Sequence, residues 1–326
     1  MKKVFTILII AVTVFVASYS ISYSWGFYAH KRINRLSVFT LPPEMITFYK
    51  KHIEFITEHA VDPDKRRYAV DGEAPRHFID IDHYSEEDPF GVMPRKWEDA
   101  IEKYTEDTIQ EYGIVPWHLE VMMGRLTRAF IDQDLDRILQ YSADFGHYIG
   151  DAHVPLHTTE NYNGQMTNQK GIHGFWESRL PELFSEDYEF WVGKARYIDD
   201  PRDYFWITVE QSHAALDSVL GFERELNEKF PTDQKYNYET RGTITMKQYS
   251  REYSAEFHVM MDGMVERRMK RAIITIGCMW YTAWVNAGQP NLEMLGEEVS
   301  DEFLNELKKE DDAYKGGKIK GREHGH

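Results

Sequence analysis

Two pairs of metal-type side chains place the tightest constraint on the fold of this 326-residue chain. His147 and Asp151 are four residues apart in a segment with helical patterning, so they share one helix face and can hold one ion together. His173 and Glu177 repeat the spacing after a short polar loop. The chain therefore has to bring two helix faces together around imidazole and carboxylate groups. This mixture of ligands favours zinc over calcium or magnesium, which prefer oxygen ligands alone.

Helical periodicity dominates the rest of the sequence, and runs of alternating β-branched residues are scarce. Apolar residues recur at three- and four-residue spacings, which predicts helices over 97–112, 119–130, 135–149, 205–227 and 255–286. An aromatic content of 14% suits helices that pack through large side chains. No linker-like segment divides the chain. We therefore expect an all-α fold with one mainly helical domain over residues 25–305.

The N-terminus has the features of a cleavable secretory signal over residues 1–24. Two lysines precede an apolar run over 4–17, and Ser22 and Ser24 supply small residues before the cut. Cleavage there would make Trp25 the first residue of an exported protein with a free amine. An uncleaved N-terminal anchor is the alternative interpretation.

Composition limits the classes of function. A formal net charge of −16 argues against tight, contact-rich binding of long duplex DNA. It does not exclude a nuclease, because bound cations dominate the local electric field of a metal site. Cys278 is the only cysteine, so no intrachain disulfide can form, and bound metal is a natural source of stability for an exported chain. Residues 306–326 are charged and Gly-rich, which predicts a disordered tail.

Three motifs carry a resemblance to a known superfamily. Trp25-Gly26 is followed by His30, the segment 147–157 reads HYIGDAHVPLH, and the segment 173–177 reads HGFWE. With these motifs the chain resembles the zinc-dependent phospholipases C and the single-strand-specific nucleases (nucleases S-one and P-one). The resemblance runs in patches over residues 25–182. Glu177 stands where the fungal nucleases carry Asp and the phospholipases carry Glu.

The resemblance implies an exported α-helical protein that holds three zinc ions. The implied ligands are Asp64, His77, His147 and Asp151 for the first ion, the amine and carbonyl of Trp25 with His30 and a bridging Asp151 for the second, and His157, His173 and Glu177 for the third. Asp64 is followed by Arg67, as in the Asp-x-x-Arg of the superfamily. Asp62 lies at an equally acceptable distance from His77, so both aspartates remain candidates at this stage.

The chemistry implied is hydrolysis of a phosphoric ester by metal-activated hydroxide. Asp64 and Arg67 are the candidate catalytic residues, with Arg67 stabilising charge on phosphorus. Phe78 and Asp80 occupy the positions that hold a base by stacking and hydrogen bonding in the nucleases. The alternatives are that Arg67 forms a structural salt bridge, that Phe78 belongs to the core, and that Asp80 supports a ligand histidine.

The sequence therefore predicts a nuclease and 3′-nucleotidase acting on single-stranded nucleic acid or nucleotides. A zinc-dependent phospholipase C acting on phospholipids is the alternative that uses the same metal chemistry. A non-catalytic, zinc-stabilised binding protein is a third hypothesis, which the large set of ligands disfavours. No obligate protein partner is evident from the sequence.

Overall fold

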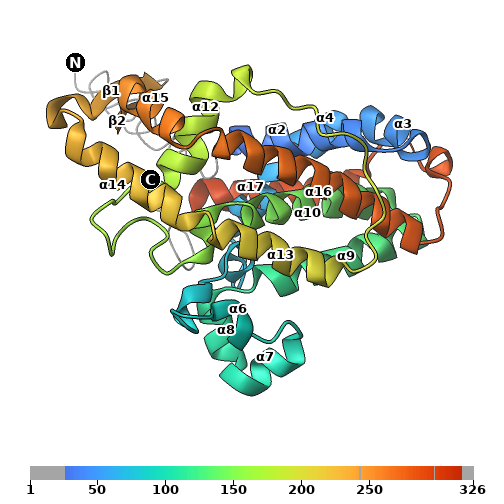
Figure 1. The fold of residues 1–326 in the computed structure, drawn as a ribbon. Coiled ribbons are helices and arrows are strands. Elements are labelled where there is room, and N and C mark those ends of the chain that lie inside the picture. Colours follow the sequence, from blue (N-terminus) through green and yellow to red (C-terminus); the bar gives the residue numbers. More distant parts are fainter. Residues whose placement is uncertain (1–25, 242–243, 297, 318–326) are drawn as a thin grey trace, which may run out of the picture.

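A computed structural model describes residues 26–241, 244–296 and 298–317, which form a mainly helical fold (Figure 1). The predicted signal segment 1–24 and Trp25 lie outside the described residues. The helices and strands are α2 (Phe27–Ser37), α3 (Pro43–Lys51), α4 (Ile53–Glu58), α5 (Asp62–Arg66), α6 (Pro89–Val92), α7 (Trp97–Tyr104), α8 (Glu106–Tyr112), α9 (Val115–Asp132), α10 (Leu135–Ala152), α11 (Ile172–Gly174), α12 (Leu180–Phe184), α13 (Pro201–His213), α14 (Leu216–Lys229), β1 (Tyr236–Arg241), β2 (Ile244–Tyr249), α15 (Arg251–Met260), α16 (Met264–Asn286) and α17 (Asp301–Gly316). Among the described helices, none combines the length and apolar character that a membrane crossing requires.

Helix α10 lies at the centre of the fold, in contact with α2, α9 and α16. Every residue of α10 from 142 to 152 is buried, so this half of the helix is enclosed on all sides. Trp280 of α16 donates from its indole N–H to the carbonyl of Ser142 at 3.1 Å, and its ring stacks on Tyr49 of α3. These contacts hold α10 firmly in place, and α10 carries two of the predicted zinc ligands.

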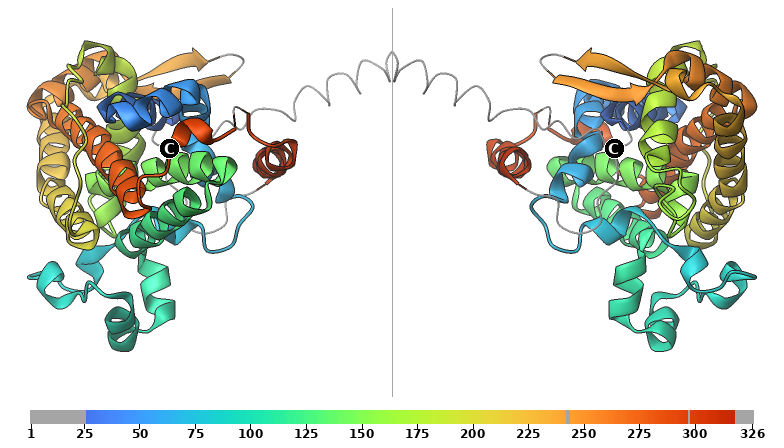
Figure 2. Two further views of the ribbon diagram at one scale, coloured as in Figure 1. Left: turned by 90° about the vertical axis from the view of Figure 1, so that its right-hand side faces the viewer. Right: turned by 90° about the vertical axis from the view of Figure 1, so that its left-hand side faces the viewer.

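The expectation of a mainly helical fold is confirmed, but three of the five predicted helices are divided. The predicted helix over 97–112 breaks at Thr105, whose φ is 69°, and becomes α7 and α8. The helix over 255–286 breaks before Gly263, whose φ is 70°, and the helix over 205–227 breaks between α13 and α14. A short break changes the direction of the chain and barely disturbs the apolar spacing, so periodicity alone did not reveal it. In all three ribbon views α6, α7 and α8 project from the other helices (Figures 1 and 2).

One antiparallel hairpin interrupts the helical pattern. Strands β1 and β2 pair with Tyr236 opposite Tyr249, and the hairpin lies at one end of the molecule beside α15 (Figures 1 and 2). The Arg179 guanidinium donates to both carboxylate oxygens of Glu239 in β1. Because Arg179 follows Glu177 by two residues, this ion pair attaches the hairpin close to a predicted zinc ligand.

The prediction of a disordered tail over 306–326 is wrong for residues 306–316, which belong to α17. The hydroxyl of Ser300 accepts a hydrogen bond from the Phe303 N–H and caps the helix. Phe303 and Leu307 are buried, and four-residue spacing puts them on the same face. Two apolar side chains and a good cap thus order a segment whose overall composition is highly charged. Residues 318–326 lie outside the described part of the chain.

Candidate metal centre

Three groups of buried histidine and carboxylate side chains meet inside the fold, and within each group the potential ligand atoms lie within 4.8 Å of one another. The groups are His30, His147 and Asp151; Asp64, His77 and His147; and His157, His173 and Glu177. All eight predicted ligands in the described residues are therefore brought together, each with no more than 5% of its surface exposed. The ninth, Trp25, lies outside the described residues. Gly26, which follows it, donates its N–H to the hydroxyl of Ser178, beside Glu177.

Several short elements deliver these side chains to one place. α10 carries His147 and Asp151, with His147 Nε2 3.2 Å from Asp151 Oδ2, as the four-residue spacing predicts. His173 Nε2 likewise lies 3.2 Å from Glu177 Oε2. Between these last two residues the chain enters a π-helix over Phe175–Arg179, which is uncommon in proteins and occurs often at functional sites.

Asp151 is the carboxylate that connects the groups. Its Oδ1 lies 3.3 Å from His30 Nε2, and its Oδ2 lies 2.9 Å from His77 Nδ1. The rings of His30 and His147 stack with centroids 3.9 Å apart. One carboxylate with its two oxygens directed at different histidines can bridge two ions, as the resemblance implied.

Backbone carbonyls fix the orientation of three histidines. The Nδ1 atoms of His147, His157 and His173 lie 2.9, 2.6 and 3.1 Å from the carbonyl oxygens of Ala60, His77 and Tyr162. A carbonyl can only accept a hydrogen bond, so each Nδ1 carries a proton and donates it. The Nε2 of each ring then points into the centre, where its lone pair can bind a metal ion once it carries no proton. This is the usual way in which a protein orients histidine as a metal ligand.

Several buried carboxylate oxygens of the centre make no hydrogen bond within the described residues. Neither oxygen of Glu177 accepts a hydrogen bond from a described group, and the same holds for Oδ2 of Asp64, although both carboxylates are buried. A buried carboxylate is unfavourable unless positive charge lies beside it, and here the nearest groups are histidines, which supply that charge only when they are protonated or bind a metal ion. Imidazole nitrogen combined with carboxylate oxygen fits zinc.

The pKa shifts have the same electrostatic cause. Burial opposes a charged imidazole at His147, but Asp151 and Asp64 outweigh it and raise the pKa of His147 to about 9. Burial opposes ionisation of Glu177, but His173 and His157 hold the pKa of this carboxyl well below its usual range. The site thus favours ionised carboxylates and attracts cations, whether these are protons or metal ions.

The geometry separates the two candidate aspartates of α5. Asp64 Oδ1 lies 3.8 Å from His77 Nδ1 and 3.7 Å from His147 Nε2, inside the centre. Asp62 faces away, with Oδ2 2.5 Å from His59 Nδ1 and Oδ1 3.0 Å from Lys65 Nζ. Asp64 is therefore the residue placed to bind metal.

The other predicted site residues lie close to the centre but are enclosed. Arg67 is 3% exposed, and its Nη1 lies 3.9 Å from Asp64 Oδ1. Burial lowers the pKa of Arg67, while Asp64 and Asp151 act in the opposite direction. Phe78 and Asp80 are 3% and 5% exposed, so the Phe78 ring offers no open stacking face in this conformation.

Glu73 is a buried residue of this region that the sequence did not reveal. It accepts a hydrogen bond from the Tyr148 hydroxyl, its Oε2 lies 2.5 Å from Arg76 Nη1, and its Oε1 lies 3.7 Å from His77 Nε2. Arg66 and His77 outweigh burial, so the pKa of Glu73 falls well below its usual range. A charged Glu73 behind His77 leaves the Nδ1 of that ring available to the centre.

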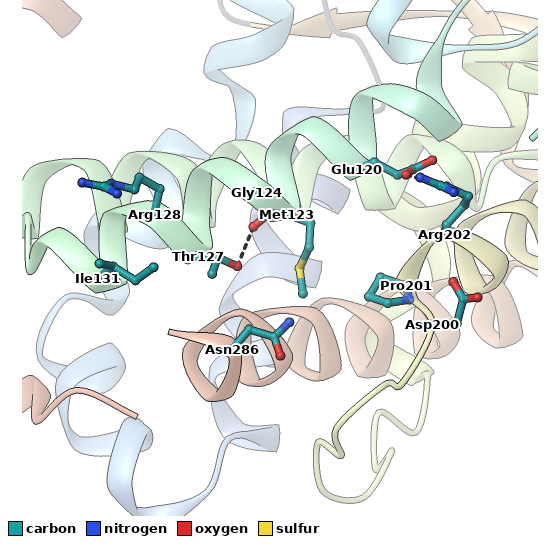
Figure 3. A pocket seen from close by; sticks show the side chains of 10 residues that line it. All are labelled: Glu120, Met123, Gly124, Thr127, Arg128, Ile131, Asp200, Pro201, Arg202 and Asn286. Atoms are coloured by element: carbon teal, nitrogen blue, oxygen red, sulfur yellow. Dashed lines mark hydrogen bonds and ion pairs between the residues drawn. The ribbon is translucent and has the colours of Figure 1, made fainter. Parts of the chain in front are cut away.

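A separate cavity of about 680 Å³ lies between α9, the start of α13 and the end of α16 (Figure 3). Its lining includes Met123, Ile131 and Pro201 and contains none of the eight candidate ligands. Arg202 at its edge is paired with Glu120 at 2.7 Å. The cavity therefore supplies no group to the metal centre.

Neither a scan against models of protein families nor a search of curated proteins finds a match to this chain.

Proposed function

We propose that this chain is an exported zinc-dependent phosphoesterase. Its activity would be that of a nuclease and 3′-nucleotidase on single-stranded nucleic acid or nucleotides. The observation that carries the proposal is the convergence of eight buried ligand-type side chains beside Arg67. The motifs around His147 and His173 support the same interpretation through their resemblance to the zinc nucleases and phospholipases.

The residues of the chain have distinct roles in this proposal. Asp64, His77, His147 and Asp151 would hold one ion, His30 with the Trp25 amine a second, and His157, His173 and Glu177 a third. Zinc bound there supplies Lewis acidity and lowers the pKa of water. Arg67, enclosed at the edge of the centre, would donate hydrogen bonds to non-bridging phosphate oxygens. The burial of Arg67 strengthens these bonds, because little water competes with the phosphate for a buried guanidinium.

The group of His157, His173 and Glu177 favours an enzyme over a binding protein. A structural zinc site is closed by four protein ligands, whereas three protein ligands leave a position for water or substrate. The choice of substrate is less constrained. Two features favour a phospholipase: Glu177 is the residue that the phospholipases carry, and the buried Phe78 offers no open ring for a base. The net charge of −16 favours a nuclease, because it disfavours docking on anionic lipid.

The test starts from the chain processed to begin at Trp25. Zinc content is measured by mass spectrometry, and hydrolysis is assayed on single-stranded DNA, a 3′-nucleotide and phosphatidylcholine. We expect about three zinc ions per chain and faster hydrolysis of the nucleic acid substrates. Asp151→Asn should lower the zinc content by at least one ion per chain and the rate of hydrolysis by more than tenfold, because it removes the bridging carboxylate. His83→Asn, at an exposed histidine outside the centre, is the matched control and should retain the metal.

A second experiment tests whether the N-terminal amine of Trp25 binds zinc. One alanine added before Trp25 should lower the zinc content from about three ions to two. Unchanged zinc and activity in the extended chain would contradict the proposed second site. Preference for phosphatidylcholine would replace the nuclease by the phospholipase, and a chain without zinc or hydrolysis would overturn the proposal as a whole.

A further inference from the structure

A second polar cavity, of about 350 Å³, opens between α5, α9 and α10. It lies behind the candidate metal centre, because Glu73 lines it and also stands 3.7 Å from His77 Nε2. None of the eight candidate ligands lines this cavity. Any function of the cavity therefore has to come from its own side chains.

The charges around this cavity are mainly positive. Its lining contains Arg66, Arg76, Arg125 and Arg137, against the carboxylates of Glu73 and Asp144. Burial raises the pKa of Asp144 to about 6, even with Arg66 beside it, so its negative charge is only weakly favoured. The lining therefore carries a surplus of at least two positive charges in a chain whose net charge is −16.

One of these arginines is buried with unused hydrogen-bonding capacity, and a second, which is exposed, has little bonding to the protein. Arg66 is 8% exposed, and its Nη2 lies 2.7 Å from Asp144, but its Nη1 makes no hydrogen bond with any described group. The only hydrogen bond of Arg125 within the described residues is a long one of 3.9 Å to the sulfur of Met122. Structures rarely leave a buried guanidinium donor without an acceptor, so the Nη1 of Arg66 points to an anion. Arg125 is exposed, so its guanidinium can reach such an anion from the solvent side of the cavity.

Helix α17 already brings anionic oxygens to the edge of the cavity. Glu310 Oε2 lies 3.5 Å from Arg66 Nη1, and Glu306 Oε2 lies 3.4 Å from Arg137 Nη2. Charge-assisted hydrogen bonds are usually about 2.7–2.9 Å long, so both contacts are loose. The two glutamates thus mark positions where the arginines attract oxygen atoms, and they leave the guanidinium groups able to form shorter hydrogen bonds with another anion.

We propose that this cavity is an anion site that binds a phosphate group, separately from the metal centre. A phosphate offers several oxygens and up to two negative charges, which matches guanidinium groups converging from α5, α9 and α10. A carboxylate offers only two oxygens. The volume leaves room for a small group esterified to the phosphate. Inorganic phosphate and a phosphomonoester are therefore the two sources of the ligand.

Isothermal titration calorimetry of the full processed chain with inorganic phosphate tests the site, and glycerol phosphate is titrated in parallel. Arg125→Gln and Arg137→Gln should each weaken binding by about tenfold, because each removes charge-assisted donors. Arg128→Gln is the matched control, since Arg128 is an exposed arginine of the same helix that pairs with Asp132. The double variant Glu306→Gln/Glu310→Gln should bind phosphate more tightly, because it removes the competing charges.

The metal centre is a second place where phosphate could bind, so a His173→Asn variant is titrated as well. Loss of binding in this variant, with Arg125→Gln unaffected, would overturn the cavity proposal and leave the proposed function standing. Equal affinity of Arg125→Gln and Arg128→Gln, or no binding at millimolar phosphate, would overturn it too. If His173→Asn still binds phosphate and Arg125→Gln does not, the result supports the site in the cavity. The probe that binds more tightly then shows whether the ligand is inorganic phosphate or a phosphomonoester.

Discussion

His118 is a buried histidine of α9 outside the candidate metal centre. Burial is the main cause that lowers its pKa well below the usual value, and the positive charge of Arg76 adds to the effect. The folded chain therefore resists protonation of His118, whereas the unfolded chain binds the proton near pH 6.5. The stability associated with neutral His118 is complete above pH 6.5 and declines as the pH falls below it.

Replacing His118 by Leu should remove this contribution to the pH dependence. At pH 5.5 the unmodified chain should have lost about 1.4 kcal/mol through His118, relative to neutral pH, and the variant should not. Urea unfolding at pH 7.5 and 5.5 measures the difference. The other histidines are common to both chains and cancel in the comparison. Parallel pH curves for the two proteins would contradict a neutral, buried His118.

At the residue scale, sequence reasoning succeeded where a short motif contained the side chain. His157 and Glu177 were assigned from local strings, and the structure places both at the centre. Glu73 was not identified from the sequence, because its partners Tyr148 and Arg76 are common residues that form no recognisable motif with it. The carbonyl of Ala60 escaped for a simpler reason: a backbone oxygen carries no sequence signal at all.

At the scale of helices, α2 and α10 approach closely at Gly146. A Cβ atom at this position would lie 2.1 Å from Oδ1 of Asn34, whose amide donates to the carbonyl of Ala143 at 2.9 Å. Glycine thus permits the approach that brings His30 of α2 to Asp151 of α10.

Gly146→Ala should lower the free energy of unfolding by about 1–3 kcal/mol through overpacking. Gly221→Ala is the matched control in α14, because nothing lies within 4 Å of its added methyl group. It should stabilise the chain by up to about 1 kcal/mol, through helix propensity alone. Urea unfolding of both variants measures the two effects. A stabilised Gly146→Ala variant would show that α2 and α10 are not packed as described.

The helices also show where periodicity stops being informative. The pattern found the second half of α10 only because Gly146, His147 and Gly150 are embedded in strongly apolar neighbours. It did not find α17, since Phe303 and Leu307 are isolated in a charged segment and gain burial only by packing on the rest of the fold. The π-helix that carries Glu177 was equally invisible, because its extra residue per turn depends on tertiary contacts.

At the scale of the whole molecule, the candidate ligands come from residues 30 to 177, so the centre ties together α2, α5 and α10 with the segment that follows α10. Local patterns predicted the long central helices but contained no information on which helices meet. The grouping of ligands came from the resemblance alone. The structure reproduces the group of His157, His173 and Glu177, whereas His147 lies in both of the other groups and Asp151 falls in the one with His30.

This arrangement predicts that the stability of the whole chain depends on bound metal. Without metal, the buried carboxylates of Asp64, Asp151 and Glu177 face histidine nitrogens, so the positive charge beside them has to come from protons on those rings. A metal ion that replaces these protons supplies more charge at the same place. Metal that binds only the folded chain stabilises it by about 2.7 kcal/mol at a free concentration one hundred times the Kd. A chelator should therefore lower the apparent melting temperature by several degrees, and added zinc should restore it.

The melting curve is recorded by circular dichroism on protein whose metal content is measured in parallel. Glu177→Gln serves as the comparison, because it weakens one group of ligands and also removes a buried negative charge. Its metal-free form should melt at a lower temperature than the metal-free parent, because His157 and His173 lose the negative charge that they face, and its gain on adding zinc should also be smaller. An equal melting temperature for the parent with and without metal would show that these buried side chains are satisfied without an ion.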